Sequence, residues 1–144
     1  MAVTDKLKAL QADTYALFLK LHNYHWHVKG MQFDAIHKMT EGMYEKMATL
    51  FDDTAERVLQ LGGKPYVSMQ DLATHSRIEE ETRTSFTAQD VVEGVIRDYE
   101  FLLREFRDLA EVADEQNDPT SVAMAEDQIA ELEKSLWMLR SMLG

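Results

Sequence analysis

Hydrophobic residues recur at three- and four-residue spacing along most of the chain, which is the period of an amphipathic α-helix. Glycine or proline interrupts the pattern at Gly30, Gly62-Gly63, Pro65 and Pro119. No segment shows the sustained alternation of a half-buried strand, so the expected fold class is all-α. The pattern predicts four long helices and one short helix, over residues 4–29, 34–61, 69–75, 88–115 and 119–142.

The connections between these segments predict how they pack. The turn from Gly30 to Phe33 is so short that the first two long helices must be antiparallel neighbours. Residues 64–86 are too many for a simple turn, and a crossover along the length of a helical bundle explains them. We therefore expect one domain, residues 1–144, built as a four-helix bundle with one long crossover that carries the short helix.

Polar residues at the segment starts are typical of helix N-caps. Thr87 followed by Asp90 resembles a capping box, and Asp118 followed by Pro119 is a typical start for the last helix. The same reasoning predicts three further N-caps, at Thr4, Asp34 and Ser68.

Composition narrows the class of protein. A hydrophobic fraction of 45% is typical of a folded globular chain, and no apolar run of about 18 residues predicts a membrane span. The first residues lack the pattern of a signal peptide, so we expect a cytoplasmic protein. The chain has no cysteine, which excludes disulfides and thiolate metal sites.

The net charge of −11 disfavours binding to a phosphate backbone, which requires clustered lysine and arginine. DNA binding is therefore unexpected, although a local basic patch would permit it. DNA compaction, with iron binding secondary, stays open as the alternative function.

Potential metal ligands are concentrated between residues 22 and 57, which hold four of the five histidines. Imidazole and carboxylate groups together suit transition metals such as iron. The pairs His37/Glu41 and Asp52/Glu56 each have i,i+4 spacing, so each pair lies on one helix face. At about 100° per residue, all four fall within an arc of about 100°, away from the hydrophobic stripe of the same helix.

Distance excludes a single site on that helix. Fifteen residues separate His37 from Asp52, or about 22 Å of helix, whereas metal–ligand bonds are about 2 Å long. An antiparallel second copy would bring its Asp52 and Glu56 beside the first copy's His37 and Glu41, and a two-fold axis would form two such sites. We therefore expect an inter-subunit site that His25 completes from the preceding helix. No Glu-x-x-His motif, which would build a centre inside one bundle, occurs in the chain.

Several nearby residues have two interpretations. His22 is either a neighbour of the site or an ordinary polar residue, and Trp26 is either a packing residue or an electron donor close to the metal. Near the start of the last helix, acidic residues could line an entrance pore, although acids are favourable at any helix N-terminus; these are Asp118, Glu126 and Asp127.

The motifs His25-Trp26-x-Val28-x-Gly30, His37-x-x-x-Glu41 and Asp52-x-x-Ala55-Glu56-Arg57 resemble the ferroxidase signature of the Dps family of mini-ferritins. The resemblance covers nearly the whole chain and is greatest to the bacterioferritin-like, neutrophil-activating branch. It implies a ferritin-like fold and assigns His25, His37, Asp52 and Glu56 as iron ligands. Glu41 stands where the family usually has aspartate, which puts occupancy of a second iron site in doubt.

The resemblance implies a ferroxidase that oxidises Fe(II), preferentially with hydrogen peroxide, and stores ferric mineral in a hollow dodecamer. Such a protein would protect against oxidative stress. A zinc-bound structural dimer without turnover is a second rival, because the same donors suit zinc.

Overall fold

The computed structural model describes residues 2–144, which form five helices and one isolated bridge between Val28 and Phe86. This confirms the all-α prediction. None of the helices formed by these residues combines the length and the apolar content needed to cross a bilayer. The helices are α1 (Ala2–His27), α2 (Phe33–Gln60), α3 (Met69–His75), α4 (Ala88–Glu115) and α5 (Pro119–Leu143).

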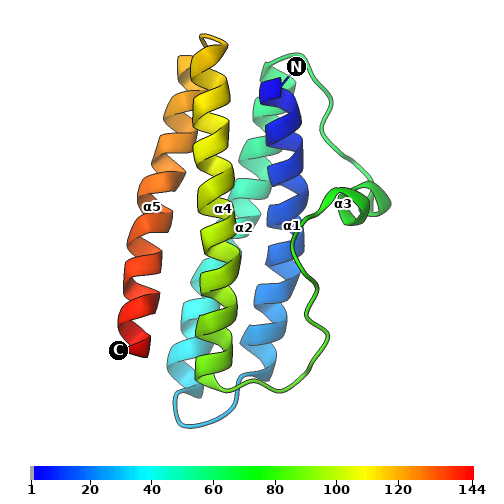
Figure 1. Cartoon of the computed structure of the whole chain (residues 1–144). Coiled ribbons are helices and arrows are strands. Elements are labelled where there is room, and N and C mark those ends of the chain that lie inside the picture. The colour runs from blue at the N-terminus through cyan, green and yellow to red at the C-terminus, as the bar shows by residue number, and fades with distance from the viewer. Residues whose placement is uncertain (1) are drawn as a thin grey trace.

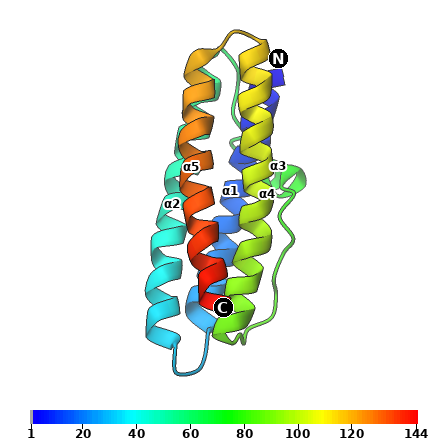
Figure 2. The same cartoon turned by 60° about the vertical axis from the view of Figure 1, so that its left-hand side comes forward.

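The four long helices form an elongated bundle of two antiparallel hairpins, α1–α2 and α4–α5 (Figure 1). The α1–α2 turn lies at one end of the bundle and the α4–α5 turn at the other (Figure 2). The segment between α2 and α4 therefore runs the length of the bundle, with α3 projecting from its side (Figure 1). This is the expected crossover with its short helix.

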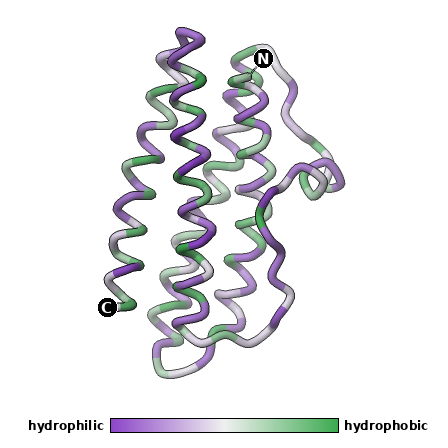
Figure 3. Tube along the Cα trace, in the orientation of Figure 1, coloured by the Kyte–Doolittle hydropathy of each residue, from purple (hydrophilic) through white to green (hydrophobic). Residues whose placement is uncertain are grey.

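The hydrophobic stripes of the long helices meet between the two hairpins. Hydrophobic and hydrophilic positions alternate turn by turn along each long helix (Figure 3). The core includes residues from all four long helices, among them Leu17, Leu21, Met47, Val58, Leu102, Phe106, Leu136 and Leu139. Burial of these side chains supplies the main driving force for packing the hairpins together.

Two predicted helix starts are wrong. Thr4 lies inside α1 with its side chain buried, so it is not an N-cap. Helix α2 begins at Phe33 with Gln32 as its N-cap, because its first helical bond runs from the Ile36 N–H to the Gln32 carbonyl oxygen at 3.0 Å. Asp34 therefore lies in the first turn and forms an i,i+4 ion pair with Lys38 at 2.9 Å.

Helix α1 ends two residues earlier than predicted. The Lys29 N–H donates to the Phe86 carbonyl oxygen at 2.8 Å, and the Phe86 N–H donates to the His27 carbonyl oxygen at 3.2 Å. These bonds to the end of the crossover replace the next turn of helix. Gly30 then adopts a φ of 113°, which favours glycine and redirects the chain towards α2.

The other helix starts follow the sequence. Ser68 caps α3, and Thr87 and Asp90 form a complete capping box at α4. Asp118 caps α5 by accepting a hydrogen bond from the Ser121 N–H at 3.1 Å. Side-chain caps fix where each helix begins because they satisfy backbone N–H groups that have no partner within the helix.

Polar side chains of α1 bind the crossover along its length. Gln11 exchanges two hydrogen bonds with the Tyr66 backbone, and Lys20 donates to the Glu79 carbonyl oxygen at 2.8 Å. Asn23 donates to the carbonyl oxygens of residues 81 and 83, both at 2.9 Å. The fully buried Asp13 carboxylate accepts hydrogen bonds from the backbone and guanidinium of Arg77. The crossover is therefore fixed to α1 at several points along its length.

Candidate metal centre

His25, near the end of α1, and His37, in the second turn of α2, lie face to face at the α1–α2 turn. Their ring centroids are 3.6 Å apart and the ring planes differ by 13°. Nδ1 of His25 lies 2.6 Å from the His37 carbonyl oxygen, and Nδ1 of His37 lies 2.8 Å from the His25 carbonyl oxygen. Each residue therefore fixes the side chain of the other.

These contacts determine the hydrogen position on each neutral ring. A carbonyl oxygen can only accept a hydrogen bond, so both Nδ1 atoms carry the hydrogen. The unprotonated atom of each neutral ring is then Nε2, whose lone pair is available to a metal. Histidine ligands in metal sites are commonly oriented by such a bond from the other ring nitrogen.

Neighbouring side chains add to this rigidity. The hydroxyl of the buried Thr40 lies 3.2 Å from Nδ1 of His25 and donates to the Ile36 carbonyl oxygen at 2.8 Å. Phe33 also stacks on His37, with the ring centroids 5.0 Å apart. His25 is only 6% exposed, so its orientation is set by the fold.

A cluster of carboxylates occupies the other end of α2. Asp52, Asp53 and Glu56 are all exposed, and each can place one oxygen within 4.8 Å of the others. No ion pair between these three acids and a basic side chain was found within residues 2–144. The cluster therefore concentrates negative charge at one point of the surface.

Glu56 shows the effect of this crowding. The negative charge of Asp52 raises the pKa of Glu56, their shared hydrogen bond raises it further, and Asp53 adds to the effect. A like charge nearby disfavours ionisation, and a bound cation would reverse that balance. The carboxylate end of α2 is thus suited to hold a cation.

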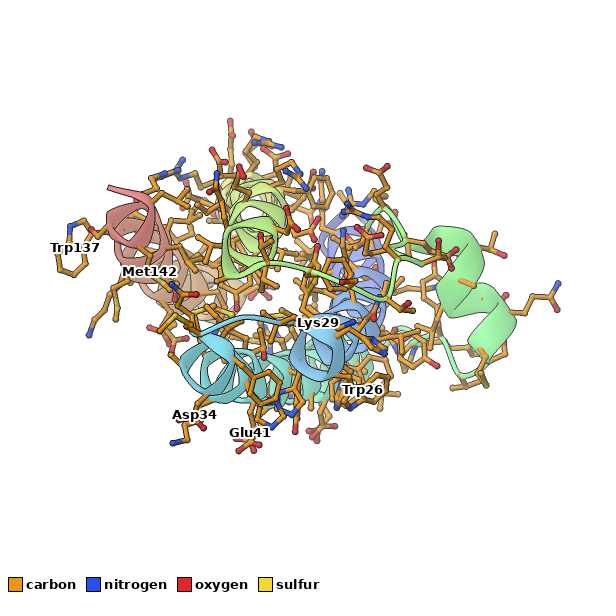
Figure 4. All side chains as sticks on the ribbon, turned by 90° about the horizontal axis from the view of Figure 1, so that it is seen from below. Trp26, Lys29, Asp34, Glu41, Trp137 and Met142 are labelled. Carbon is orange, nitrogen blue, oxygen red and sulfur yellow. The ribbon has the colours of Figure 1, made fainter. Side chains whose placement is uncertain are left out.

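The structure brings the predicted ligands together in two groups, not one. His25 lies against His37, and Asp52 lies beside Glu56, but about 22 Å of helix separates the groups. Within residues 2–144, the only three-donor group of histidine and acidic residues is Asp52, Asp53 and Glu56. Glu41 is exposed one turn beyond His37 and points away from α4 and α5 (Figure 4).

Aromatic residues surround the histidine pair. Trp26 is 58% exposed and lies on the same side of the molecule as Glu41 (Figure 4). His22 is half-buried, with its ring stacked on Tyr44 at a centroid distance of 3.7 Å. His22 is therefore part of the packing around His25 rather than an isolated polar residue.

The three predicted pore residues differ from one another in their environment. The Asp118 carboxylate accepts a hydrogen bond from Arg57 at 2.8 Å. Burial acts to raise the pKa of Asp118, but the hydrogen bonds from Ser121 and the charge of Arg57 lower it overall. Asp118 thus has a fixed structural partner, while Glu126 and Asp127 are exposed on α5. The role of these three residues in a pore stays a prediction.

A groove of about 580 Å³ lies between α1 and the crossover. Its lining includes Leu19 and Trp26 from α1 and Leu72 and Ile78 from the crossover segment. Leu19 and Trp26 are both more than half exposed. An exposed apolar surface of this kind is typical of a protein interface.

Comparison with known proteins places this geometry in a family. A profile described as "Ferritin-like domain" matches residues 4–144. The chain is 45% identical over 144 residues to "DNA protection during starvation protein" of Helicobacter pylori strain J99, and the match covers all of both chains. The chain belongs to the Dps family of ferritin-like proteins.

Solved Dps-like structures have the same fold. The crystal structure of Helicobacter cinaedi CAIP has a TM-score of 0.98 and 46% identity, and the match covers 99% of each chain. The Dps protein of Vibrio cholerae O1 has a TM-score of 0.95 and 29% identity over 99% of this chain and 89% of its own. That protein is described as a member of a broad superfamily of ferritin-like diiron-carboxylate proteins.

Sequence reasoning missed three residues that lie close to the predicted ligands. Asp53 joins the carboxylate cluster although it lies about 100° from Asp52 around the helix. Thr40 was overlooked because threonine within a helix is usually unremarkable. Tyr44 had a signal, since it falls about 20° from His37 on the same face of α2.

Proposed function

We propose that this protein is a ferroxidase that binds Fe(II) at sites shared between two subunits. Nε2 of His25 and of His37, with Glu41, forms one half of each site. Asp52 and Glu56 of the partner subunit form the other half. The observation that carries this proposal is the distance along α2 between His37, which is held against His25 of α1, and the uncompensated acid pair Asp52 and Glu56.

The two halves have complementary chemical roles. The neutral imidazoles bind Fe(II) without adding charge, and the carboxylates stabilise the additional positive charge of Fe(III). Hydrogen peroxide, the oxidant in this proposal, accepts one electron from each of two ferrous ions. The balanced reaction is 2 Fe²⁺ + H₂O₂ → 2 Fe³⁺ + 2 OH⁻, and it releases no hydroxyl radical.

Assembly and storage follow from the same proposal. The shared site requires at least a two-fold pair of subunits, and we propose that six such pairs form a hollow dodecamer. The net charge of −11 favours attraction of ferrous ions and nucleation of ferric mineral inside it. Light scattering with iron analysis tests this, because a monomer that retains oxidised iron would contradict it.

Anaerobic addition of Fe(II) followed by peroxide tests the ligand assignment. Asp52→Ala should slow formation of Fe(III), followed by absorbance, by about 100-fold or more because a ligand is lost. Glu111→Ala is a matched control, since Glu111 is an exposed acid of α4 outside the proposed site. Oxidation at the wild-type rate in Asp52→Ala, or a similar defect in both variants, would refute the assignment.

Complementation between variants tests whether the site is shared. His37→Ala subunits lack the histidine half but keep the acid half, and Asp52→Ala subunits have the reverse defect. A pair containing one of each has one intact site, so co-refolding equal amounts should restore about a quarter of the sites. If each site lay within one chain, the mixture would stay inactive.

DNA compaction remains a second candidate because the relative is named "DNA protection during starvation protein". Ion pairing counts against it. Within residues 2–144 there are ten ion pairs, two of which share Arg77, and they engage nine of the 15 lysine and arginine residues. A gel shift at low salt decides, because phosphate contacts are strongest there. A ferroxidase that removes Fe(II) and peroxide would protect DNA from oxidation without binding to it.

A further inference from the structure

A continuous series of aromatic rings leads from the proposed iron ligands to the surface. The rings of His37 and His25 are 3.6 Å apart, and the His25 ring is 5.2 Å from Tyr44 at an angle of 89°. Tyr44 stacks on His22 at 3.7 Å, and His22 is 5.4 Å from Trp26. Each ring of the series therefore contacts the next.

Tyr44 and Trp26 are the two readily oxidised side chains in this series, and they occupy different positions. Trp26 has ring contacts with His22 and His27. Tyr44 contacts His25 directly and lies between that residue and His22. We propose that Tyr44 is the one-electron donor of the site, an inference that rests on the proposed ferroxidase function.

The donor matters when only one ferrous ion occupies a site. One ferrous ion alone would reduce peroxide by one electron and release hydroxyl radical. With Tyr44 the reaction is Fe²⁺ + H₂O₂ + Tyr–OH → Fe³⁺ + OH⁻ + H₂O + Tyr–O•. Iron and tyrosine each lose one electron, peroxide gains two, and the phenolic hydrogen ends in water. A later ferrous ion restores the tyrosine by Tyr–O• + Fe²⁺ + H⁺ → Tyr–OH + Fe³⁺.

The packing of Tyr44 keeps its ring beside the ligand. Phe18 contacts the edge of Tyr44 at 5.8 Å and also contacts His22 at 4.5 Å. The His22 ring is itself fixed, because its Nδ1 donates to the Phe18 carbonyl oxygen at 2.8 Å. Tyr44→Phe would retain this stacking and remove only the hydroxyl group, which makes it a suitable test.

Tyr66→Phe is a matched control. Tyr66 also stacks on a histidine, His75, at 4.5 Å and 15°. Its backbone is bonded to Gln11, which is 14 residues, or about 21 Å, from His25 along α1. A nonspecific effect of removing a stacked phenol would therefore appear in both variants.

The experiment loads the assembled protein with one ferrous ion per subunit, adds peroxide and freezes the sample for electron paramagnetic resonance. Parallel samples contain a spin trap for hydroxyl radical. Wild type and Tyr66→Phe should show a tyrosyl signal. Tyr44→Phe should lack that signal and yield several-fold more trapped hydroxyl radical. An unchanged tyrosyl signal in Tyr44→Phe would overturn the inference.

Two further measurements separate this inference from the proposed function. If wild type forms Fe(III) but no tyrosyl signal, the Tyr44 assignment fails and the ferroxidase proposal stands. If wild type forms no Fe(III), both fail. Trp26→Phe should keep the tyrosyl signal. If the wild-type radical is instead a tryptophanyl signal that Trp26→Phe lacks, the donor is Trp26 and the Tyr44 inference fails.

Discussion

The two ends of the ligand face of α2 differ in how the chain prepares them. At the histidine end, His25 and His37 are fixed by backbone carbonyl oxygens and by stacking. At the carboxylate end, Asp52 and Glu56 are exposed and repel each other. One end is rigid, and the other carries charge that its own chain leaves uncompensated.

This difference shows how a shared site can be encoded in one helix. The histidine end provides geometry, which requires buried partners and therefore a folded hairpin. The carboxylate end provides charge, which requires only closely spaced acids at the surface. Four variants test the contrast, beginning with the largest expected effect.

His37→Ala should affect both binding and stability. It removes one ligand and releases His25, so we expect Fe(II) or Zn(II) affinity to fall by about 100-fold in calorimetric titration. The lost bonds and stacking should lower the free energy of unfolding by roughly 1–3 kcal/mol. His75→Ala is the control, because His75 is exposed and bonds within its own short helix. If His75→Ala lost as much metal affinity and stability as His37→Ala, the special role of the histidine end of α2 would be contradicted.

Gly94→Ala tests whether the packing behind α1 keeps the histidine end rigid. A Cβ at Gly94 would overlap the hydroxyl of Tyr24, the residue next to His25. Overpacking should lower the free energy of unfolding by about 1–3 kcal/mol in denaturant titrations. Gly42→Ala should instead raise the free energy of unfolding by up to about 1 kcal/mol. Gly42 lies within α2 with open space around it, and alanine favours the helix more than glycine does. If Gly94→Ala leaves the free energy of unfolding unchanged, α1 can shift to accommodate the added Cβ.

Thr40→Val keeps the shape of the side chain and removes the hydroxyl near Nδ1 of His25. We expect about tenfold weaker metal binding, measured by the same titration, because the ring loses part of its orientation. Thr49→Val is the matched control, since the Thr49 hydroxyl bonds only within the exposed part of α2. If Thr40→Val binds the metal with unchanged affinity, the hydrogen bond to the His37 carbonyl oxygen is sufficient to orient the His25 ring without Thr40.

Glu56→Gln should slightly raise the melting temperature of the metal-free protein at neutral pH. The raised pKa of Glu56 means that ionising this group costs the folded state stability above that pKa. Below the ordinary value of 4.5 the group is protonated whether folded or unfolded, so the gain should vanish there. With Zn(II) added, Glu56→Gln should instead lower the melting temperature, because the metal binds the Glu56 carboxylate. A rise in melting temperature that is the same at every pH would contradict the proposed repulsion between Asp52 and Glu56.

The periodicity of the sequence predicted the helices well because burial of a hydrophobic stripe dominates their stability. The caps at Thr4 and Asp34 were wrong because a cap depends on where the chain enters the helix. At the turn, that point is set by the bond from the Ile36 N–H to the Gln32 carbonyl oxygen, a backbone bond that carries no side-chain signal.

The ligand pairs could be predicted because i,i+4 spacing places two side chains on one face. Contacts between different helices carry no such spacing signal. The bonds between Nδ1 of each histidine and the carbonyl oxygen of the other depend on how α1 meets α2, and so does the stacking of Tyr44 on His22. Such details require the packed structure.

The way α1 holds the crossover determines which positions can vary. Gln11, Lys20 and Asn23 bind mainly to backbone oxygens of the crossover, which every amino acid provides. Residues 66, 79 and 83 should therefore accept many substitutions, whereas the three α1 residues should accept few. The information that specifies the path of this long loop resides in the helix beneath it, and a library randomised across both segments would show that asymmetry among its folded members.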